Sequence, residues 1–200
     1  MSQYDEDEII ERLLGDKTGT YVDIGAGHPY HLSNTWALYE RGMTGLLIEP
    51  IPEMADLLRE DRPLDKVEQV AAFNDNKISS FYVGGIGNTT GLSSMNKDWL
   101  PSDCIHREIE VVVRRTQDIL NCYPEIRDNA VLCSIDVEGS ERNVIEGIDF
   151  RLFRPFLFVI ESLESKMLKP THSQWENLLI GYEFVEESEN GLNRFYRASA

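Results

Sequence analysis

Four acidic residues stand inside or directly after short apolar runs of the kind that form buried strands. Glu49, Asp136 and Glu161 each follow such a run, and Asp23 lies within the first one, ahead of a glycine turn. In an open α/β sheet, ligands bind at the rim formed by the carboxyl ends of the strands. Carboxylates at that rim accept hydrogen bonds from hydroxyls, attract cations and take up protons. An acid-rich chain also places some acids at strand ends by chance, and that interpretation stays open for each residue alone.

The first strand and its turn, YVDIGAG at residues 21–27, form the most specific motif of the N-terminal half. Gly25 and Gly27 allow a tight turn and a close approach of the backbone to a ligand. The helix expected to begin at Ser33 points free N–H groups toward the same space, which favours an anionic group there. Glu49, at the end of the next strand, is placed to accept hydrogen bonds from both hydroxyls of a ribose.

Residue 30 distinguishes between two kinds of nucleotide ligand. The dinucleotide pattern GxGxxG requires a third glycine at this position, but the chain has Tyr30. A side chain there disfavours the close approach of a pyrophosphate. We therefore expect a nucleoside that carries a carboxylate, such as S-adenosylmethionine, rather than a nicotinamide dinucleotide.

A second acidic motif, SIDVEGSE at residues 134–141, follows a later strand. Asp136 ends the strand and can face the same cleft as Glu138, where a carboxylate would attract a cation such as a sulfonium. Glu138 lies just beyond it and is placed to take a proton from a hydroxyl nucleophile. Glu141 suits a structural role at the N-terminus of a helix, where the helix dipole favours an acid.

Two histidines follow the glycine turn. His28 is the rival base for the same proton, although packing or hydrogen bonding is the commoner role for such a residue. With His31 it forms an HxxH pair that has no further ligand nearby in the sequence, so a zinc site is not favoured.

The elements that must position these residues alternate between strand and helix. Apolar runs separated by helical patterns predict a mostly parallel sheet that is covered on both faces. Asn190-Gly191 between two alternating segments predicts a C-terminal antiparallel hairpin, which adds one antiparallel strand to the sheet. The expected strands are 21–24, 45–48, 67–73, 78–83, 108–115, 130–135, 155–160, 182–188 and 192–198, and the expected helices are 5–14, 33–41, 52–58, 117–122, 141–146 and 173–180.

Two of the expected helices carry a sequence pattern for an N-terminal capping box, Asp5 with Glu8 and Ser173 with Glu176. No linker or repeat interrupts the chain, so residues 1–200 are expected to form a single domain. Within it, residues 1–20 hold an N-terminal helix, and the less regular segment 74–115 is expected to shape the binding site of a second substrate.

Composition excludes several classes of protein and partner. The 200 residues carry 19 Lys+Arg against 35 Asp+Glu, a net charge of −16, which repels nucleic acids and anionic membrane surfaces. No apolar run is long enough to span a membrane, and the acidic N-terminus does not resemble a signal peptide. The three cysteines, Cys104, Cys122 and Cys133, are widely spaced and suggest reduced thiols in a cytoplasmic protein.

These motifs together resemble the FkbM family of S-adenosylmethionine-dependent methyltransferases. The resemblance runs in the expected order from Tyr21 almost to the C-terminus. It rests on YVDIGAG with SNT at 33–35, RGMTGLLIEPIPE at 41–53, VAAF at 70–73, GLSSM at 91–95, SIDVEGSERNVIEGIDF at 134–150, FRPFLFVIE at 153–161 and GYEFV at 181–185. The chain departs from the family at His28 and Pro29, where small residues are usual.

The resemblance implies a Rossmann-like class I methyltransferase fold with a seven-stranded, mostly parallel sheet. It also implies methyl transfer to oxygen, often a sugar or polyketide hydroxyl. The glycine turn then lines the methionine part of the cofactor, Glu49 binds the ribose, 71–73 lie near the adenine, and Asp136 lies near the sulfonium. The cofactor-binding residues expected from these motifs are Asp23, Gly25, Ala26, Gly27, Asn34, Glu49, Pro50, Ala72, Phe73 and Asp136, and the catalytic ones are Glu138, Asp136 and His28.

Asp136 and Glu161 are also candidate ligands of Mg²⁺, because related sugar O-methyltransferases place acids at these two strand ends around that ion and oxygen ligands suit it. The acceptor is expected to be a small molecule or a glycan, and a homodimer is possible. Two alternatives remain open. One is a non-catalytic module that binds the nucleoside, and the other is a nicotinamide-dependent oxidoreductase, which the missing third glycine disfavours.

Overall fold

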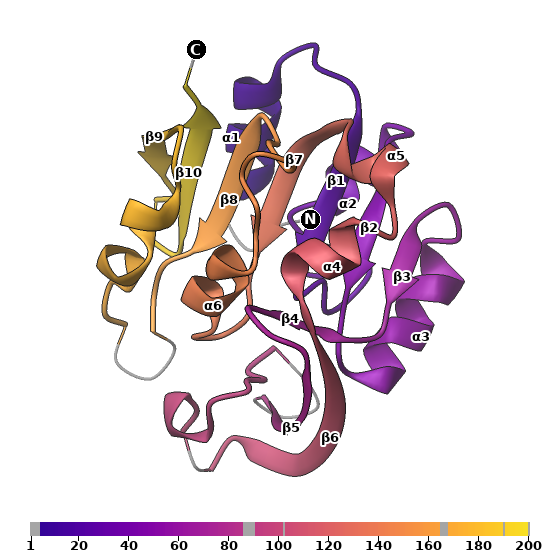
Figure 1. Ribbon diagram of the computed structural model, residues 1–200, viewed down its shortest axis with the longest axis vertical. Coiled ribbons are helices and arrows are strands. Elements are labelled where there is room, and N and C mark those ends of the chain that lie inside the picture. Colours follow the sequence, from indigo (N-terminus) through magenta and orange to yellow (C-terminus); the bar gives the residue numbers. More distant parts are fainter. Residues whose placement is uncertain (1–4, 86–90, 102, 165–167, 190, 200) are drawn as a thin grey trace.

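The computed structural model describes residues 5–85, 91–101, 103–164, 168–189 and 191–199. Its main feature is a seven-stranded sheet with the strand order β3-β2-β1-β7-β8-β10-β9 (Figure 1). The strands are β1 (Thr20–Ile24), β2 (Thr44–Ile48), β3 (Lys66–Glu68), β7 (Ala130–Ile135), β8 (Leu157–Glu161), β9 (Tyr182–Glu187) and β10 (Asn193–Ala198).

Strand directions confirm the predicted fold. β3, β2, β1, β7 and β8 pair in parallel, and β10 runs antiparallel to both β8 and β9. The chain therefore enters β10 through a terminal hairpin, as the sequence predicts, although residue 190 of its turn lies outside the described part. All the parallel strands end at one edge, so Glu49, Asp136 and Glu161 come to the same rim.

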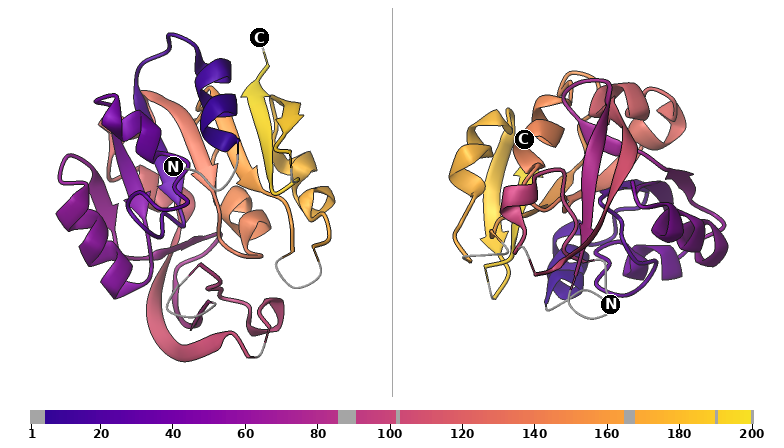
Figure 2. Two further views of the ribbon diagram at one scale, coloured as in Figure 1. Left: turned by 180° about the vertical axis from the view of Figure 1, so that it is seen from behind. Right: turned by 90° about the horizontal axis from the view of Figure 1, so that it is seen from below.

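Helices cover both faces of this sheet, as Figures 1 and 2 show. One buried cluster joins apolar residues of α1, α2 and α3 to one face of the strands, and a second joins α4, α5 and α6 to the other face. The strands are buried on both sides because each faces a helical layer, which is why they read as continuous apolar runs. The helices are α1 (Glu6–Leu14), α2 (Trp36–Glu40), α3 (Pro52–Asp61), α4 (Thr116–Leu120), α5 (Pro124–Arg127) and α6 (Glu141–Glu146).

A second, three-stranded sheet projects beyond the carboxyl edge of the first. It has the order β4-β6-β5, from β4 (Ala71–Phe73), β5 (Lys77–Gly84) and β6 (Ile105–Arg115). β5 and β6 form a long antiparallel ladder, and β4 pairs in parallel with the end of β6. The segment predicted to be irregular is thus largely a hairpin, with the 3₁₀ turn η1 (Lys97–Trp99) in its connection (Figure 1).

The single strand predicted over 67–73 is wrong, because the chain changes sheets within it. β3 pairs with β2, and three residues later β4 pairs with β6. Tertiary contacts hold the second half in place: the Phe73 carbonyl accepts a hydrogen bond from Thr116 Oγ1 at 3.0 Å. A Cβ on Gly147 would lie 2.1 Å from that same carbonyl oxygen, so only glycine allows the approach.

Other element boundaries also differ from the prediction. The helix expected over 173–180 is replaced by two 3₁₀ turns, η2 (His172–Gln174) and η3 (Glu176–Leu178), around the buried Trp175. The helix expected over 33–41 shortens to α2. Neither predicted capping box forms, and the Asp5 carboxylate instead accepts from the backbone of Glu189 at 3.3 Å. Within the described residues, no helix is long and apolar enough to cross a membrane.

Candidate active site

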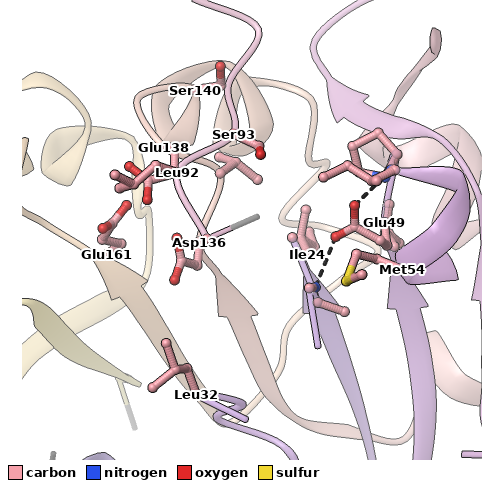
Figure 3. Close-up of a pocket in the computed structure, with 18 of the residues that line it drawn as sticks. Ile24, Leu32, Glu49, Met54, Leu92, Ser93, Asp136, Glu138, Ser140 and Glu161 are labelled. Atoms are coloured by element: carbon pink, nitrogen blue, oxygen red, sulfur yellow. Dashed lines mark hydrogen bonds between the residues drawn. The ribbon is translucent and has the colours of Figure 1, made fainter. Parts of the chain in front are cut away.

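A cavity of about 640 Å³ lies between the carboxyl edge of the main sheet and the second sheet. Its wall combines the glycine turn after β1, the residues after β2, the acidic ends of β7 and β8, and the segment 91–95. Figure 3 shows Glu49 on one side of this cavity and three carboxylates on the other. The two sides therefore differ in the number of acids they present.

The glycine turn brings β1 against the end of β7. Gly25 has a φ of +83°, and a Cβ there would lie 1.7 Å from the Asp136 carbonyl oxygen. The Asp136 amide in turn donates to the carbonyl of Ile24 at 2.9 Å. Only glycine fits at position 25, so the turn packs directly against the backbone of Asp136. The turn also has no side chain there to block the approach of a ligand in the cavity.

Glu49 is buried beside this turn and is held by two backbone amides. Gly27 N–H donates to Oε2 at 2.9 Å and Ile51 N–H donates to Oε1 at 2.7 Å (Figure 3). Burial raises the pKa of the Glu49 carboxyl to about 7, although both amide bonds lower it. Each carboxylate oxygen can accept more than one hydrogen bond, so two acceptor sites remain for the hydroxyls of a ligand.

Asp136, Glu138 and Glu161 form the acidic side of the cavity. One carboxylate oxygen from each lies within 4.8 Å of the others, and Figure 3 shows the three groups side by side. Burial raises the pKa of Asp136 to about 6 and holds the pKa of Glu161 well above its usual range, where the Asp136 charge adds to the effect. In the described part of the chain, this is the one cluster of three or more potential metal ligands.

The backbone of Glu138 adopts a left-handed conformation with a φ of +49°. A non-glycine residue pays a steric cost there of roughly 1–2 kcal/mol. Glu141 supports the turn, because its Oε1 accepts from the amides of Gly139 at 3.0 Å and Val137 at 3.3 Å. This is the structural role expected of Glu141. These two hydrogen bonds to Glu141 hold the strained turn in place.

The connection between β5 and β6 of the second sheet contacts the same turn, residues 137–139. Ser94 Oγ donates to the Glu138 carbonyl at 2.6 Å, and Ser94 is fully buried. The indole of Trp99 covers Gly139, where a Cβ would lie 2.3 Å from the ring. The connection between β5 and β6 is therefore in direct contact with the residue predicted to be the base.

Most of the residues predicted to form the site line this cavity. The lining includes His28, Glu138 and Glu161 together with Gly25, Ala26, Gly27, Asn34, Glu49, Pro50, Ala72 and Asp136. Asn34 is fixed by a hydrogen bond from its Nδ2 to Ser134 Oγ at 3.1 Å. The structure does not bring Asp23 or Phe73 to the cavity wall. Asp23 is buried below the turn, where its Oδ2 accepts from Thr35 Oγ1 at 2.6 Å.

His28 lies in the wall as well, but its imidazole is already engaged. Its Nδ1 accepts from the His31 amide at 3.3 Å, and burial lowers the pKa of His28. A lowered pKa keeps the ring neutral at physiological pH, but Nδ1 is then the one basic nitrogen, so His28 acts as a base only if it gives up this hydrogen bond. The described residues offer no third ligand that would make the histidine pair a metal site.

Arg62 is a residue that the sequence reasoning missed. It is fully buried at the end of α3 and pairs with Asp65 at 2.8 Å. Its guanidinium also donates to Tyr21 Oη at 2.8 Å, Thr35 Oγ1 at 3.0 Å and the Pro29 carbonyl at 3.3 Å. It thereby ties the loop after the glycine turn to β1 and α3. No motif marks it, because apart from Asp65 its partners are distant in sequence and its burial is not visible in the sequence.

The fold is one that solved methyltransferases share. Solved structures with this fold include yhhF of Escherichia coli, a protein assigned as a methyltransferase, at a TM-score of 0.53 and 12% identity, with 100% of this chain and 89% of that chain covered. A TehB-like SAM-dependent methyltransferase of Corynebacterium glutamicum matches at a TM-score of 0.50 and 10% identity, with 99% and 89% covered. At these identities the likeness shows the fold alone. A sequence search of curated proteins gave no match.

The chain belongs to the FkbM methyltransferase family, because the methyltransferase FkbM domain matches residues 23–190. The predicted family and fold are thereby confirmed, and the protein is an S-adenosylmethionine-dependent methyltransferase. The cavity suits that cofactor: it has an open glycine turn, and a buried acid with unused acceptor sites stands beside it.

Proposed function

We propose that the protein transfers the methyl group of S-adenosylmethionine to a hydroxyl of a sugar, a glycan or a related small molecule. The observation that carries this proposal is the acidic side of the cavity, where Glu138 lies beside Asp136 and across from Glu49. A hydroxyl needs to lose a proton as it attacks the methyl group, and a carboxylate at this point is placed to accept it.

The chain's own residues supply alignment and charge. Glu49 holds the ribose, the glycine turn admits the methionine part, and Ala72 stands near the adenine. Asp136 faces the positive sulfur and favours its binding. The wall of the cavity orients the acceptor for in-line attack and excludes water, which supports the reaction by proximity. Asp23 lies below the glycine turn and holds Thr35 in place by accepting a hydrogen bond from its hydroxyl.

The proposal is tested with purified protein, S-adenosylmethionine and a library of sugars and glycolipid precursors. Mass spectrometry then follows the gain of one methyl group and the formation of S-adenosylhomocysteine. Products methylated on oxygen support the proposal. Methylation on nitrogen or carbon would contradict it while leaving the family assignment intact. Binding of the cofactor without turnover on any acceptor would favour a non-catalytic module.

Glu49→Ala is expected to weaken the affinity for S-adenosylmethionine by about tenfold or more, because hydrogen bonds to a charged group are worth roughly 1.5–3 kcal/mol. Isothermal titration calorimetry measures the affinity. Glu60→Ala, which removes an exposed acid from the following helix α3, is the control and should bind normally. An unchanged affinity in Glu49→Ala would mean that Glu49 is structural.

The affinity is also expected to depend on pH through Glu49. The pKa of its carboxyl is raised to about 7, and ribose hydroxyls donate to the charged form. Protonation should therefore weaken binding by about tenfold between pH 8 and pH 6. Glu49→Gln should flatten this dependence.

We further propose that Asp136 and Glu161 hold Mg²⁺, with Glu138 as a third oxygen donor within reach. The donor set fits a hard cation, and Glu161 Oε2 is buried with no hydrogen-bond partner among the described residues. Such an ion lowers the pKa of a bound hydroxyl and so assists its deprotonation. Glu138 is thus a candidate both for ligand and for base. The turnover of Glu138→Gln, measured with and without Mg²⁺, separates the two roles.

Removal of divalent ions is expected to lower turnover by about tenfold or more, since each 1.4 kcal/mol of lost stabilisation is tenfold in rate. The assay compares protein dialysed against a chelator with the same protein after Mg²⁺ is restored. Recovery on addition of Mg²⁺ supports the ion. Full activity in chelator would leave Asp136 as a cofactor contact only.

The segment 74–115 is proposed to shape the acceptor site, because Leu92, Ser93 and Met95 line the cavity opposite the cofactor turn. Domain organisation as one unit, a homodimer and a cytoplasmic location remain predictions from the sequence. In the described structure Cys104, Cys122 and Cys133 form no disulfide.

A further inference from the structure

Two buried acceptor atoms at the end of the cavity have no hydrogen-bond partner among the described residues. They are Glu161 Oε2 and Asn193 Oδ1. The two residues stand directly opposite each other on the antiparallel strands β8 and β10. Side chains of such a pair lie on the same face of the sheet with their Cβ atoms about 5 Å apart. Both residues line the cavity and both are more than nine-tenths buried.

The orientation of the Asn193 amide is fixed by Glu6 on α1. Asn193 Nδ2 donates to Glu6 Oε1 at 3.1 Å, and Glu6 is fully buried. The reverse orientation would set two oxygen acceptors against each other, so the amide oxygen must face away from Glu6. The backbone N–H and C=O of Asn193 are used by Ser188. The amide oxygen is therefore the one acceptor of Asn193 without a partner among the described residues.

The charge of this corner suits a divalent cation, because a water molecule or a hydroxyl would satisfy the acceptors without balancing the charge of the carboxylates. Glu161 and Asp136 form no ion pair with a basic side chain in the described part of the chain. Unpaired buried acceptors are costly unless something with positive charge or donor hydrogens satisfies them. Oxygens that share Mg²⁺, Mn²⁺ or Ca²⁺ lie within about 4–5 Å of one another, which the acidic cluster matches. Amide oxygens are ordinary ligands of such ions.

We propose that Asn193 completes a divalent-cation site with Glu161 and Asp136, and that Glu6 is a positioning residue that turns the Asn193 amide oxygen toward the ion. The proposal extends the metal site of the proposed function to β10 and α1. It predicts that cation affinity depends on two residues at opposite ends of the chain, neither of which is part of the acidic motifs.

The test is direct binding of Mn²⁺ to the full-length protein, followed by electron paramagnetic resonance and calorimetry in the absence of acceptor. Wild-type protein should bind one Mn²⁺, and Asp136→Asn should abolish binding at that site. Asn193→Leu should weaken the affinity by about tenfold or more. Asn74→Leu is the matched control, because Asn74 Nδ2 also donates to a glutamate, Glu146, at 2.9 Å and lies outside the cavity lining. It should bind Mn²⁺ as the wild type does.

Glu6→Gln provides a second variant that keeps the size of the side chain. A glutamine amide at position 6 can donate to Asn193 Oδ1 and turn it away, so Mn²⁺ affinity should fall while S-adenosylmethionine affinity stays unchanged. Unchanged Mn²⁺ affinity in both variants would overturn the proposal. So would the absence of Mn²⁺ binding to wild-type protein, which would indicate a proton shared by Asp136 and Glu161. Neither result bears on methyl transfer itself, which the acceptor library measures separately.

Discussion

Glu138→Gln is expected to lower the turnover number by at least about 100-fold while leaving the affinity for S-adenosylmethionine nearly unchanged. General-base assistance is typically worth about 10²–10⁴-fold, and glutamine keeps the shape of the side chain but is not an equivalent base. The left-handed backbone at this position tolerates glutamine and glutamate alike, so the fold should be kept. Turnover is measured by the formation of S-adenosylhomocysteine, and affinity by calorimetry.

His28→Asn is the comparison that separates the two candidate bases. If Glu138 takes the proton, the His28 variant should retain most of its turnover. If His28→Asn has no turnover while Glu138→Gln keeps nearly normal turnover, the base is His28. If Glu138 is instead a metal ligand, excess Mn²⁺ or Mg²⁺ should partly restore the turnover that Glu138→Gln loses.

Arg62→Leu is expected to destabilise the protein by about 3–5 kcal/mol, which is the usual cost of removing one partner from a buried ion pair. Asp65 would keep its buried charge, while Tyr21 and Thr35 would lose a donor. Urea denaturation followed by circular dichroism measures the free energy of unfolding. We also expect a weaker affinity for S-adenosylmethionine in the fraction that folds, because the loop after the glycine turn loses its anchor.

Arg59→Leu is the matched control for this variant. Arg59 lies one turn earlier on the same helix and pairs with Asp56 at 2.7 Å, but both side chains are exposed. Exposed pairs contribute little, so the free energy of unfolding should be nearly unchanged. A similar stability of both variants would show that the buried network around Arg62 is not important for folding.

The sequence predicts the core of the fold because local and tertiary signals agree there. Runs such as 21–24, 130–135 and 155–160 are apolar except for Asp23 and Ser134, and each is followed by a glycine or an acid. A strand buried on both faces needs that composition, so the run identifies both the element and its place in the sheet. The site at its edge follows from the same rule, since parallel strands end together.

The errors fall where distant contacts override local pattern. Residues 67–73 are predicted as one strand, but their first part pairs with β2 and their second part with β6. Asp5 and Ser173 have the residue types of helix caps, yet their segments are held by other contacts. Propensity is a weak guide wherever such a contact is available.

The sequence does not reveal the buried polar residues Arg62 and Asn193 for a different reason. Arg62 bonds to Tyr21 across 41 positions, and Asn193 bonds to Glu6 across 187. Neither pair produces a motif, because each residue alone looks like an ordinary member of a helix or a strand. Their significance depends on burial, which only the folded chain reveals.

The contact of Trp99 and Ser94 with the 138–139 turn has a consequence for protein engineering. Under the proposal that segment 74–115 shapes the acceptor site, this segment is the part to exchange between relatives when a new acceptor is wanted. A transplanted hairpin without an indole and a hydroxyl at these positions would leave the strained turn without its cover. The chimera would then lose its chemical step along with its old selectivity. Libraries should therefore hold Ser94 and Trp99 constant and vary the cavity-facing residues between and around them.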